Sequence, residues 1–141
     1  MPDDLMFQDQ IRDVVRSTYQ RASGGAGRAM AGRLYDQEQL DRVPEDAITW
    51  SLGVGNPTRH ARLQPGEVVV DLGCGGGIDT VLAAHAVGPT GRAIGIDTLE
   101  EMVERTTRSA EQAGVAEWCT ALRGEMEDLP LPDASADVVI S

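Results

Sequence analysis

The segment from Val68 to Asp79, which reads VVVDLGCGGGID, constrains the fold of this chain more than any other feature. Three consecutive valines predict a short strand that is buried on both faces and ends at Asp71. Glycines at alternate positions from Gly73 to Gly77 then allow a tight turn, and an apolar helix is expected to start near Ile78. A strand, a glycine turn and a helix in this order predict an α/β fold with a small-molecule site at the turn.

The spacing of the glycines argues against a dinucleotide. The dinucleotide fingerprint is G-x-G-x-x-G, but counting from Gly73 and Gly75 puts Ile78 in the place of the third glycine. An NAD-linked enzyme is therefore disfavoured. Asp71 would repel a pyrophosphate and suits a ligand that carries a positively charged amine. A glycine turn alone also fits a purely structural tight turn.

A second apolar run ends in an acid in the same way. Residues 92–97 (RAIGID) predict a strand, and Asp97 follows the glycine turn by about twenty residues, where a ribose-binding carboxylate belongs. The alternative is that Asp97 only caps the next helix. Thr98 and Glu101 already predict a capping box for that helix, which favours the ribose interpretation, and Gly114 is placed to end it.

Two further strands are expected in the second half of the chain. A strand near residues 118–123 leads into an acidic loop, in which Glu125 is placed to accept a hydrogen bond from an adenine amino group. Met126 would supply a backbone N–H or an apolar lid to the ring. The alternative is an ordinary acidic loop. Residues 136–141 (ADVVIS) predict the fourth strand.

The four segments together resemble the motifs of the class I S-adenosylmethionine-dependent methyltransferases. In order they read DLGCGGG (71–77), GID (95–97), GEMEDLPLPD (124–133) and ADVVIS (136–141). The resemblance implies a Rossmann-like α/β fold with an incomplete parallel sheet in the strand order 3-2-1-4, and S-adenosyl-L-methionine as the cofactor. The expected cofactor-binding residues are Asp71, Gly73, Cys74, Gly75, Gly77, Asp79, Asp97, Thr98, Glu125 and Met126.

Within that class the chain is similar to the arsenite methyltransferases. The similarity includes VRSTY (15–19), LGVGNP (52–57) and the long segment 75–97. That family has a cysteine where this chain has Val54, and its further cysteines would follow Ser141; thiolates are the soft ligands that suit trivalent arsenic. The resemblance implies substrate contacts at Val54, Gly55 and Asn56, and Tyr19 is the residue expected to reach the reacting centre.

We expect the chain to have two parts. Residues 1–62 are expected to form an amino-terminal helical lid, with helices near 5–21 and 44–52 and a turn at 23–27 (SGGAG) between them. Residues 63–141 are expected to form the S-adenosylmethionine-binding core, truncated after strand 4. Strand 4 would then have an unpaired apolar edge, so the chain is expected to be a fragment of a longer protein or to complete its sheet as a homodimer or with a swapped partner.

Composition excludes several partners. A formal net charge of −11, with only 12 basic residues, argues against nucleic acid. No apolar run approaches a membrane span and no signal-peptide core is evident, so a cytoplasmic location without membrane attachment is expected. Cys74 and Cys119 lie far apart without histidine partners, which predicts small buried residues and no metal site.

The resemblance therefore implies an S-adenosylmethionine-dependent methyltransferase that acts on a small molecule, similar to the arsenite methyltransferases. The cofactor supplies the reactivity, so the protein mainly has to align the methyl acceptor and exclude water. The alternative is a truncated S-adenosylmethionine-binding or assembly module without turnover of its own. Whether this chain is active alone is left open by the sequence.

Overall fold

A computed structural model describes residues 9–10, 13–14, 17–18, 26–51, 53 and 55–141. Tyr19 and Val54 lie outside the described residues, so the roles expected for them stay predictions. The helices are α2 (Ala26–Leu34), α3 (Gln37–Asp41), α4 (Glu45–Thr49), α5 (Pro57–Ala61), α6 (Ile78–Val87) and α7 (Glu100–Gln112). The strands are β1 (Val68–Leu72), β2 (Arg92–Asp97), β3 (Cys119–Arg123) and β4 (Val138–Ile140).

The four strands form one parallel sheet in the order β3-β2-β1-β4, as the sequence predicts. β1 lies beside β2 in register, with Val70 opposite Ile94 and Asp71 opposite Gly95. Asp71 is the penultimate residue of β1 and Asp97 is the last residue of β2. Because parallel strands end at the same edge of a sheet, both acids are brought to one edge.

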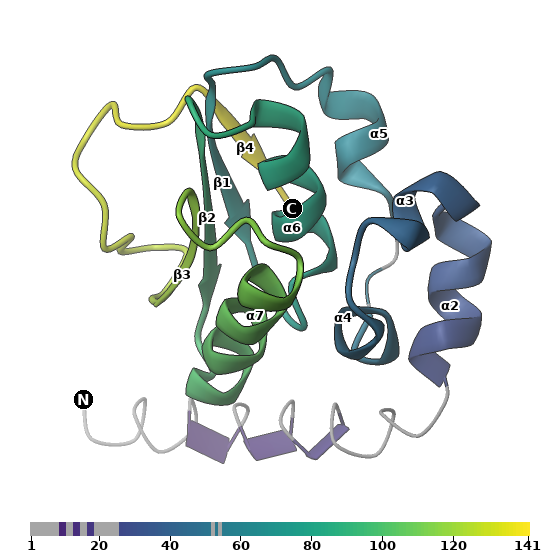
Figure 1. Ribbon diagram of the computed structural model, residues 1–141. Coiled ribbons are helices and arrows are strands. Elements are labelled where there is room, and N and C mark those ends of the chain that lie inside the picture. The colour runs from purple at the N-terminus through teal and green to yellow at the C-terminus, as the bar shows by residue number, and fades with distance from the viewer. Residues whose placement is uncertain (1–8, 11–12, 15–16, 19–25, 52, 54) are drawn as a thin grey trace.

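Helices cover one face of this sheet (Figure 1). On that face Val69, Ala93 and Ile140 belong to a buried core with residues of α6 such as Val81. The strand residues that alternate with them point to the other face, where Val70, Ile94 and Ile96 are covered by Leu129 and Leu131 of the segment that follows β3. Alternation along each strand thus divides the core into two parts.

The amino-terminal helices α2 to α5 lie beyond α6 (Figure 1). The expected turn over residues 23–27 is wrong at its end, because α2 already begins at Ala26 and includes Gly27. A Cβ at Gly27 would lie 1.9 Å from the backbone oxygen of Thr49, so glycine here permits α2 to approach the end of α4. The helix expected near 44–52 is confirmed as α4, with Pro44 as its N-cap.

The capping box expected at the start of α7 is wrong. Leu99 is the N-cap residue, and its side chain makes no capping hydrogen bond. Its backbone N–H donates instead to Oδ1 of Asp97 at 3.0 Å, while Glu101 forms an ion pair with Arg105. Gly114, with a φ of 74°, follows the last turn as expected.

Both cysteines are buried free thiols. Burial raises the pKa of Cys119 to about 12 and raises that of Cys74 far above its usual range, so neither is a thiolate near neutral pH. Among the described residues, no three His, Cys, Asp or Glu side chains gather as metal ligands would. None of the described helices combines the length and the apolar character needed to cross a bilayer.

Candidate functional site

Backbone and side-chain hydrogen bonds tie the glycine turn after β1 to the end of β2. The N–H groups of Gly73 and Cys74 both donate to the backbone oxygen of Ile96, at 2.7 Å and 3.0 Å. The N–H of Gly75 donates to Oδ2 of Asp97 at 3.0 Å. The turn therefore has a fixed shape at the carboxyl edge of the sheet, where ligands bind in open α/β folds.

Three glycines of the turn have a left-handed backbone. The φ angles of Gly73, Gly75 and Gly77 are 75°, 54° and 97°. At Gly77 a Cβ would lie 3.0 Å from Cα of Thr106, whereas at Gly75 it would meet nothing within 4 Å. Gly77 is thus required by packing, and Gly75 leaves open space beside the turn.

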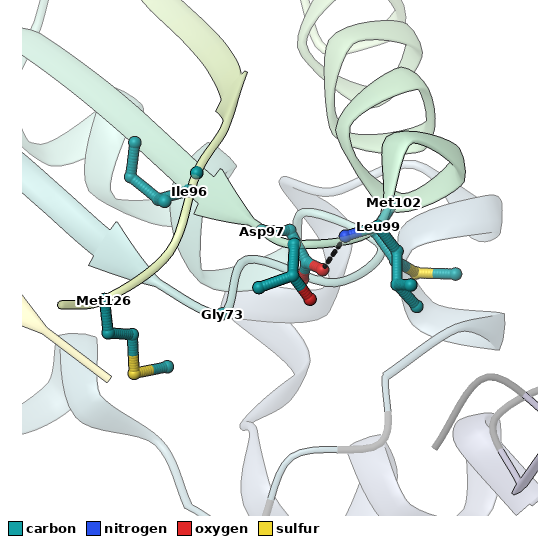
Figure 2. Close-up of a pocket in the computed structure, with 8 residues that line it drawn as sticks. Gly73, Ile96, Asp97, Leu99, Met102 and Met126 are labelled. Carbon is teal, nitrogen blue, oxygen red and sulfur yellow. Dashed lines mark hydrogen bonds between the residues drawn. The ribbon is translucent and has the colours of Figure 1, made fainter. Parts of the chain in front are cut away.

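A pocket with a volume of about 160 Å³ opens beside Gly73 and is mostly apolar. Figure 2 shows Met126 on one side of Gly73, and Asp97, Leu99 and Met102 on the other. The lining residues of this apolar pocket are Gly73, Ile96, Asp97, Thr98, Leu99, Met102, Gly124 and Met126. It combines flat apolar walls with a single carboxylate, which suits a ring joined to a hydroxylated sugar.

A second pocket, of about 80 Å³, also includes Gly73 in its lining. The lining residues of this acidic pocket are Tyr35, Trp50, Ser51, Gly53, Gly73, Cys74, Gly75, Gly76, Ile78 and Asp79. The amino-terminal helices supply one wall and the glycine turn supplies the other. Gly73 therefore lines both pockets.

Two carboxyl groups lie at or near the acidic pocket: the half-buried Asp79 lines it, and the buried Asp71 is close to Asp79. Asp71 is 4% exposed, and its Oδ2 accepts a hydrogen bond from Oγ1 of Thr80 at 2.6 Å. Burial raises the pKa of Asp71 to about 7, although the Thr80 hydrogen bond opposes this rise. Burial also raises the pKa of Asp79 to about 6, against the effect of a hydrogen bond from Tyr35. A cation placed here would favour the ionised form of both groups.

Tyr35 joins the amino-terminal helices to the turn. Its hydroxyl donates to Oδ1 of Asp79 at 2.8 Å and lies 3.2 Å from the backbone oxygen of Gly55. Burial, followed by the charge of Asp79, raises the pKa of Tyr35 far above its usual range, so it stays protonated. Ser51, which is 3% exposed, also lines this pocket, and its Oγ has no hydrogen-bond partner among the described residues.

The structure brings most of the predicted cofactor residues to these pockets. Thr98 and Met126 line the apolar pocket with Asp97, and Cys74 and Asp79 line the acidic one. Glu125 lies next to the apolar pocket in an isolated bridge with Asp128. The contacts with a bound cofactor expected of all these residues stay predictions.

The predicted substrate residues have structural partners. The side-chain oxygen of Asn56 accepts the N–H of Arg59 at the start of α5, and its amide nitrogen donates to the backbone oxygen of Leu34 at 3.1 Å. Gly55 contributes its carbonyl to Tyr35. These contacts hold Gly55 and Asn56 against the end of α2, and a role in substrate binding stays a prediction for both residues.

Sequence reasoning missed the residues that α2 and α4 supply to the acidic pocket, which are Tyr35, Trp50 and Ser51. No motif marks them, because they reach the turn through packing between distant segments. The only available signal was the phenol of Tyr35 at the end of a helical segment, and a lone tyrosine is too common to carry a prediction.

Comparisons with known proteins agree with this geometry. The methyltransferase domain family matches residues 63–141. An arsenite methyltransferase from Halobacterium salinarum is 41% identical over 107 residues, which are 76% of this chain and 27% of that protein. The chain thus spans about a quarter of the length of this relative.

Solved structures give the same result. An arsenic(III) S-adenosylmethionine methyltransferase from Chlamydomonas reinhardtii is 28% identical with a TM-score of 0.61, over 73% of this chain and 36% of that one. An RNA methyltransferase from Salinibacter ruber, solved in complex with S-adenosyl-L-homocysteine, is 28% identical with a TM-score of 0.51, over 57% of this chain and 50% of that one. The Rossmann-like fold that the motifs implied is thereby confirmed. The chain belongs to the methyltransferase domain family.

Proposed function

We propose that this chain binds S-adenosyl-L-methionine across the apolar and acidic pockets and serves methyl transfer to a small molecule, as in the arsenite methyltransferases. The single observation that carries the proposal is that an apolar pocket and an acidic pocket share Gly73 as a lining residue. A cofactor with an adenosine at one end and an amino acid at the other needs two unlike pockets joined at the edge of the sheet.

The apolar pocket suits the adenosine part. Ile96, Leu99 and Met102 supply apolar walls of the kind on which an adenine ring packs. Each oxygen of Asp97 already accepts one backbone N–H, from Leu99 and from Gly75. A carboxylate has about four lone-pair sites, so Asp97 can still accept hydrogen bonds from the ribose hydroxyls.

The acidic pocket suits the methionine part, which carries an ammonium and a sulfonium. Asp79 and the nearby Asp71 supply negative charge there. The open space beside Gly75 is where a Cβ would block the ligand, and the unpartnered Oγ of Ser51 leaves a polar contact available for it. The residues of the acidic pocket therefore fit the methionine part of the cofactor.

The bound cofactor would supply an electrophilic methyl group on its sulfonium. The residues of this chain would orient that group, and the amino-terminal part, residues 1–62, would act as a lid that excludes water. Tyr35, Trp50 and Ser51 support the lid assignment, because they form the outer wall of the acidic pocket. A small acceptor fits better than a nucleic acid, since the net charge is −11.

Calorimetry with two ligands tests this proposal. S-adenosyl-L-homocysteine should fill both pockets, and 5′-methylthioadenosine, which lacks the amino acid part, only the apolar one. Asp79→Asn should therefore weaken the first ligand about tenfold and leave the second unchanged. Equal losses for both ligands would contradict the assignment of the acidic pocket to the amino acid part.

A second candidate is a cofactor-binding or assembly module without turnover. It is favoured by Val54, which stands at the position where arsenite methyltransferases have a cysteine. A methyl-transfer assay with arsenite and a thiol separates the two candidates. Cofactor binding without methylated arsenic would support the module.

We also propose that the free edge of β4 pairs with a second chain. In the described part of the chain β4 pairs only with β1, and its Val139 is 56% exposed. An apolar strand edge of this kind favours strand pairing. A monomer mass by light scattering, together with a cooperative melt, would contradict this.

A cytoplasmic location is proposed as well, because both cysteines are free thiols.

A further inference from the structure

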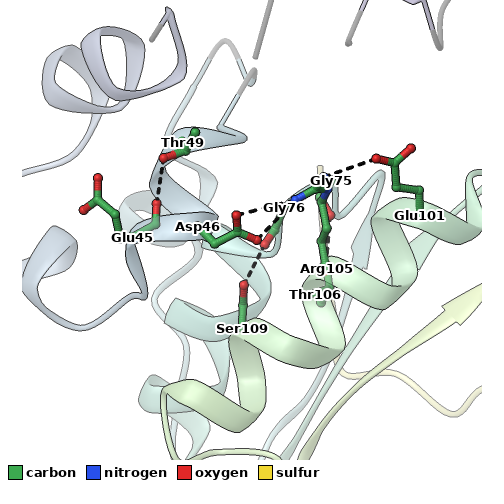
Figure 3. A network of polar contacts seen from close by, with 9 residues as sticks. All are labelled: Glu45, Asp46, Thr49, Gly75, Gly76, Glu101, Arg105, Thr106 and Ser109. Carbon is green, nitrogen blue, oxygen red and sulfur yellow. Dashed lines mark hydrogen bonds and ion pairs between the residues drawn. The ribbon is translucent and has the colours of Figure 1, made fainter. Parts of the chain in front are cut away.

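The side chain of Arg105 links three elements around the glycine turn. It extends from α7, and its guanidinium carbon lies 3.7 Å from the centroid of the Trp50 ring at the end of α4. The same guanidinium forms ion pairs with Asp46 of α4 at 3.4 Å and with Glu101 of α7 at 3.2 Å (Figure 3). Its side chain is only 17% exposed, whereas those of Asp46 and Glu101 are 40% and 34% exposed.

Trp50 is in turn packed directly on the glycine turn. A Cβ at Gly76 would lie 2.7 Å from Cβ of Trp50 and 3.4 Å from the backbone oxygen of Ala47. Trp50 also lines the acidic pocket, together with Ser51. A change in the position of the Trp50 backbone would therefore move one wall of that pocket.

The helix that carries Arg105 holds the opposite wall as well. Its Thr106 hydroxyl donates to the backbone oxygen of Gly75 at 2.9 Å, and its Ser109 hydroxyl donates to that of Gly76 at 3.0 Å (Figure 3). Thr106, Ser109 and Arg105 lie on one helical face, at spacings of one turn or less. One face of α7 thus contacts both the glycine turn and α4.

We propose that Arg105 is a positioning residue that, through Trp50, holds the end of α4 against the glycine turn and keeps the acidic pocket in its ligand-binding shape. The planar guanidinium is required, because it stacks on the ring while its N–H groups reach two carboxylates. The inference rests on the proposed function, since it concerns the pocket assigned to the amino acid part of the cofactor.

Binding of the two ligands named above tests the proposal. Arg105→Gln should weaken S-adenosyl-L-homocysteine about tenfold and change 5′-methylthioadenosine less than about twofold, because only the acidic pocket depends on Trp50. Arg108→Gln, an exposed site one turn along α7, is the matched control and should bind both ligands as the parent does. Arg105→Lys keeps the charge but not the planar stack, so its affinity for S-adenosyl-L-homocysteine should fall about threefold. This variant replaces R105Q if R105Q fails to fold.

Two more measurements separate positioning from general stabilisation. In a Trp50→Leu background, R105Q should have less than about a twofold further effect on binding, since its route through the ring is gone. In a Trp118→Phe background, the emission of Trp50 should shift when Arg105 is replaced and stay unchanged for R108Q.

The outcomes are distinct. If the parent chain binds neither ligand, the proposed function fails and the inference fails with it. If the parent binds and R105Q binds S-adenosyl-L-homocysteine equally well, only the inference is overturned. Equal losses of both ligands in R105Q, or additive losses with W50L, would also overturn it, because they indicate a general loss of stability.

Discussion

Asp97, the last residue of β2, accepts the N–H of Gly75 in the turn that follows β1, at 3.0 Å. Its other oxygen accepts the N–H of Leu99, the N-cap residue of α7. One carboxylate therefore sets the shape of the glycine turn and the start of the next helix, and it also lines the apolar pocket. Asp97, which is expected to bind the ribose, thus also has a structural role at the start of α7.

Replacement of Asp97 by alanine should affect binding more than folding. The variant loses two charge-assisted hydrogen bonds at a partly exposed site, which should cost about 1–2 kcal/mol in the free energy of unfolding. Binding of both S-adenosyl-L-homocysteine and 5′-methylthioadenosine should fall at least about tenfold, because both ligands carry the ribose. Unchanged binding of either ligand by calorimetry would remove Asp97 from the site.

The stability of the chain should depend on pH through its buried acids. Burial raises the pKa of Asp71 to about 7 and that of Asp79 to about 6, from an ordinary value of 3.8. Between these values the folded chain binds more protons than the unfolded chain, so the free energy of unfolding should fall as the pH rises from about 4 to about 7. Each group contributes at most about 1.4 kcal/mol per pH unit.

Asp71→Asn should reduce this slope, because the amide has no proton to lose and can still accept from Thr80. Denaturant unfolding at several pH values measures the effect. Asp133→Asn, at an exposed position, is the matched control and should leave the slope as it is. An unaltered slope in D71N would mean that Asp71 does not titrate in this range.

Alanine substitutions at Gly75 and Gly114 form a matched pair that tests the space beside the glycine turn. Both have a left-handed backbone, with φ angles of 54° and 74°, and a Cβ at either would meet nothing within 4 Å. Alanine at each should therefore cost about 1 kcal/mol in the free energy of unfolding. Only G75A should bind S-adenosyl-L-homocysteine more weakly, because its new methyl group enters the acidic pocket. Equal binding by G75A and G114A would show that the space beside Gly75 is not used.

The hydroxyl of Thr106 should matter more than that of its neighbour Thr107. Thr106 donates to Gly75, whereas Thr107 donates to Val103 within its own helix at 2.9 Å. Thr106→Val should lower the free energy of unfolding by about 1–2 kcal/mol and weaken S-adenosyl-L-homocysteine several-fold, because the Gly75 carbonyl loses its partner. Thr107→Val should keep the affinity. Similar affinities for the two variants would argue against a role of the Thr106 hydroxyl in fixing the glycine turn.

Much of the core was predictable from local patterns. The β-branched run at Val68–Val70, the glycine spacing after it and the acid at Asp97 each depend on a few adjacent residues, and the four motifs together implied the strand order. The capping box at Thr98 was wrong because the carboxylate of Asp97 competes for the same helix start.

The outer wall of the acidic pocket was not predictable in the same way. Tyr35 meets Asp79 across 44 positions of sequence, and Arg105 meets Asp46 across 59. Such pairs depend on how α2 and α4 pack against α6 and α7, which no local pattern encodes. The end of the turn expected over residues 23–27 was wrong for the same reason, because the contact of Gly27 with Thr49 is tertiary.

Calorimetric titration of the parent chain with S-adenosyl-L-homocysteine tests the central claim most directly. We expect saturable binding of one ligand per chain, with an affinity that falls at least about tenfold in D97A. A sample that melts cooperatively and yet shows no binding at millimolar ligand would contradict it.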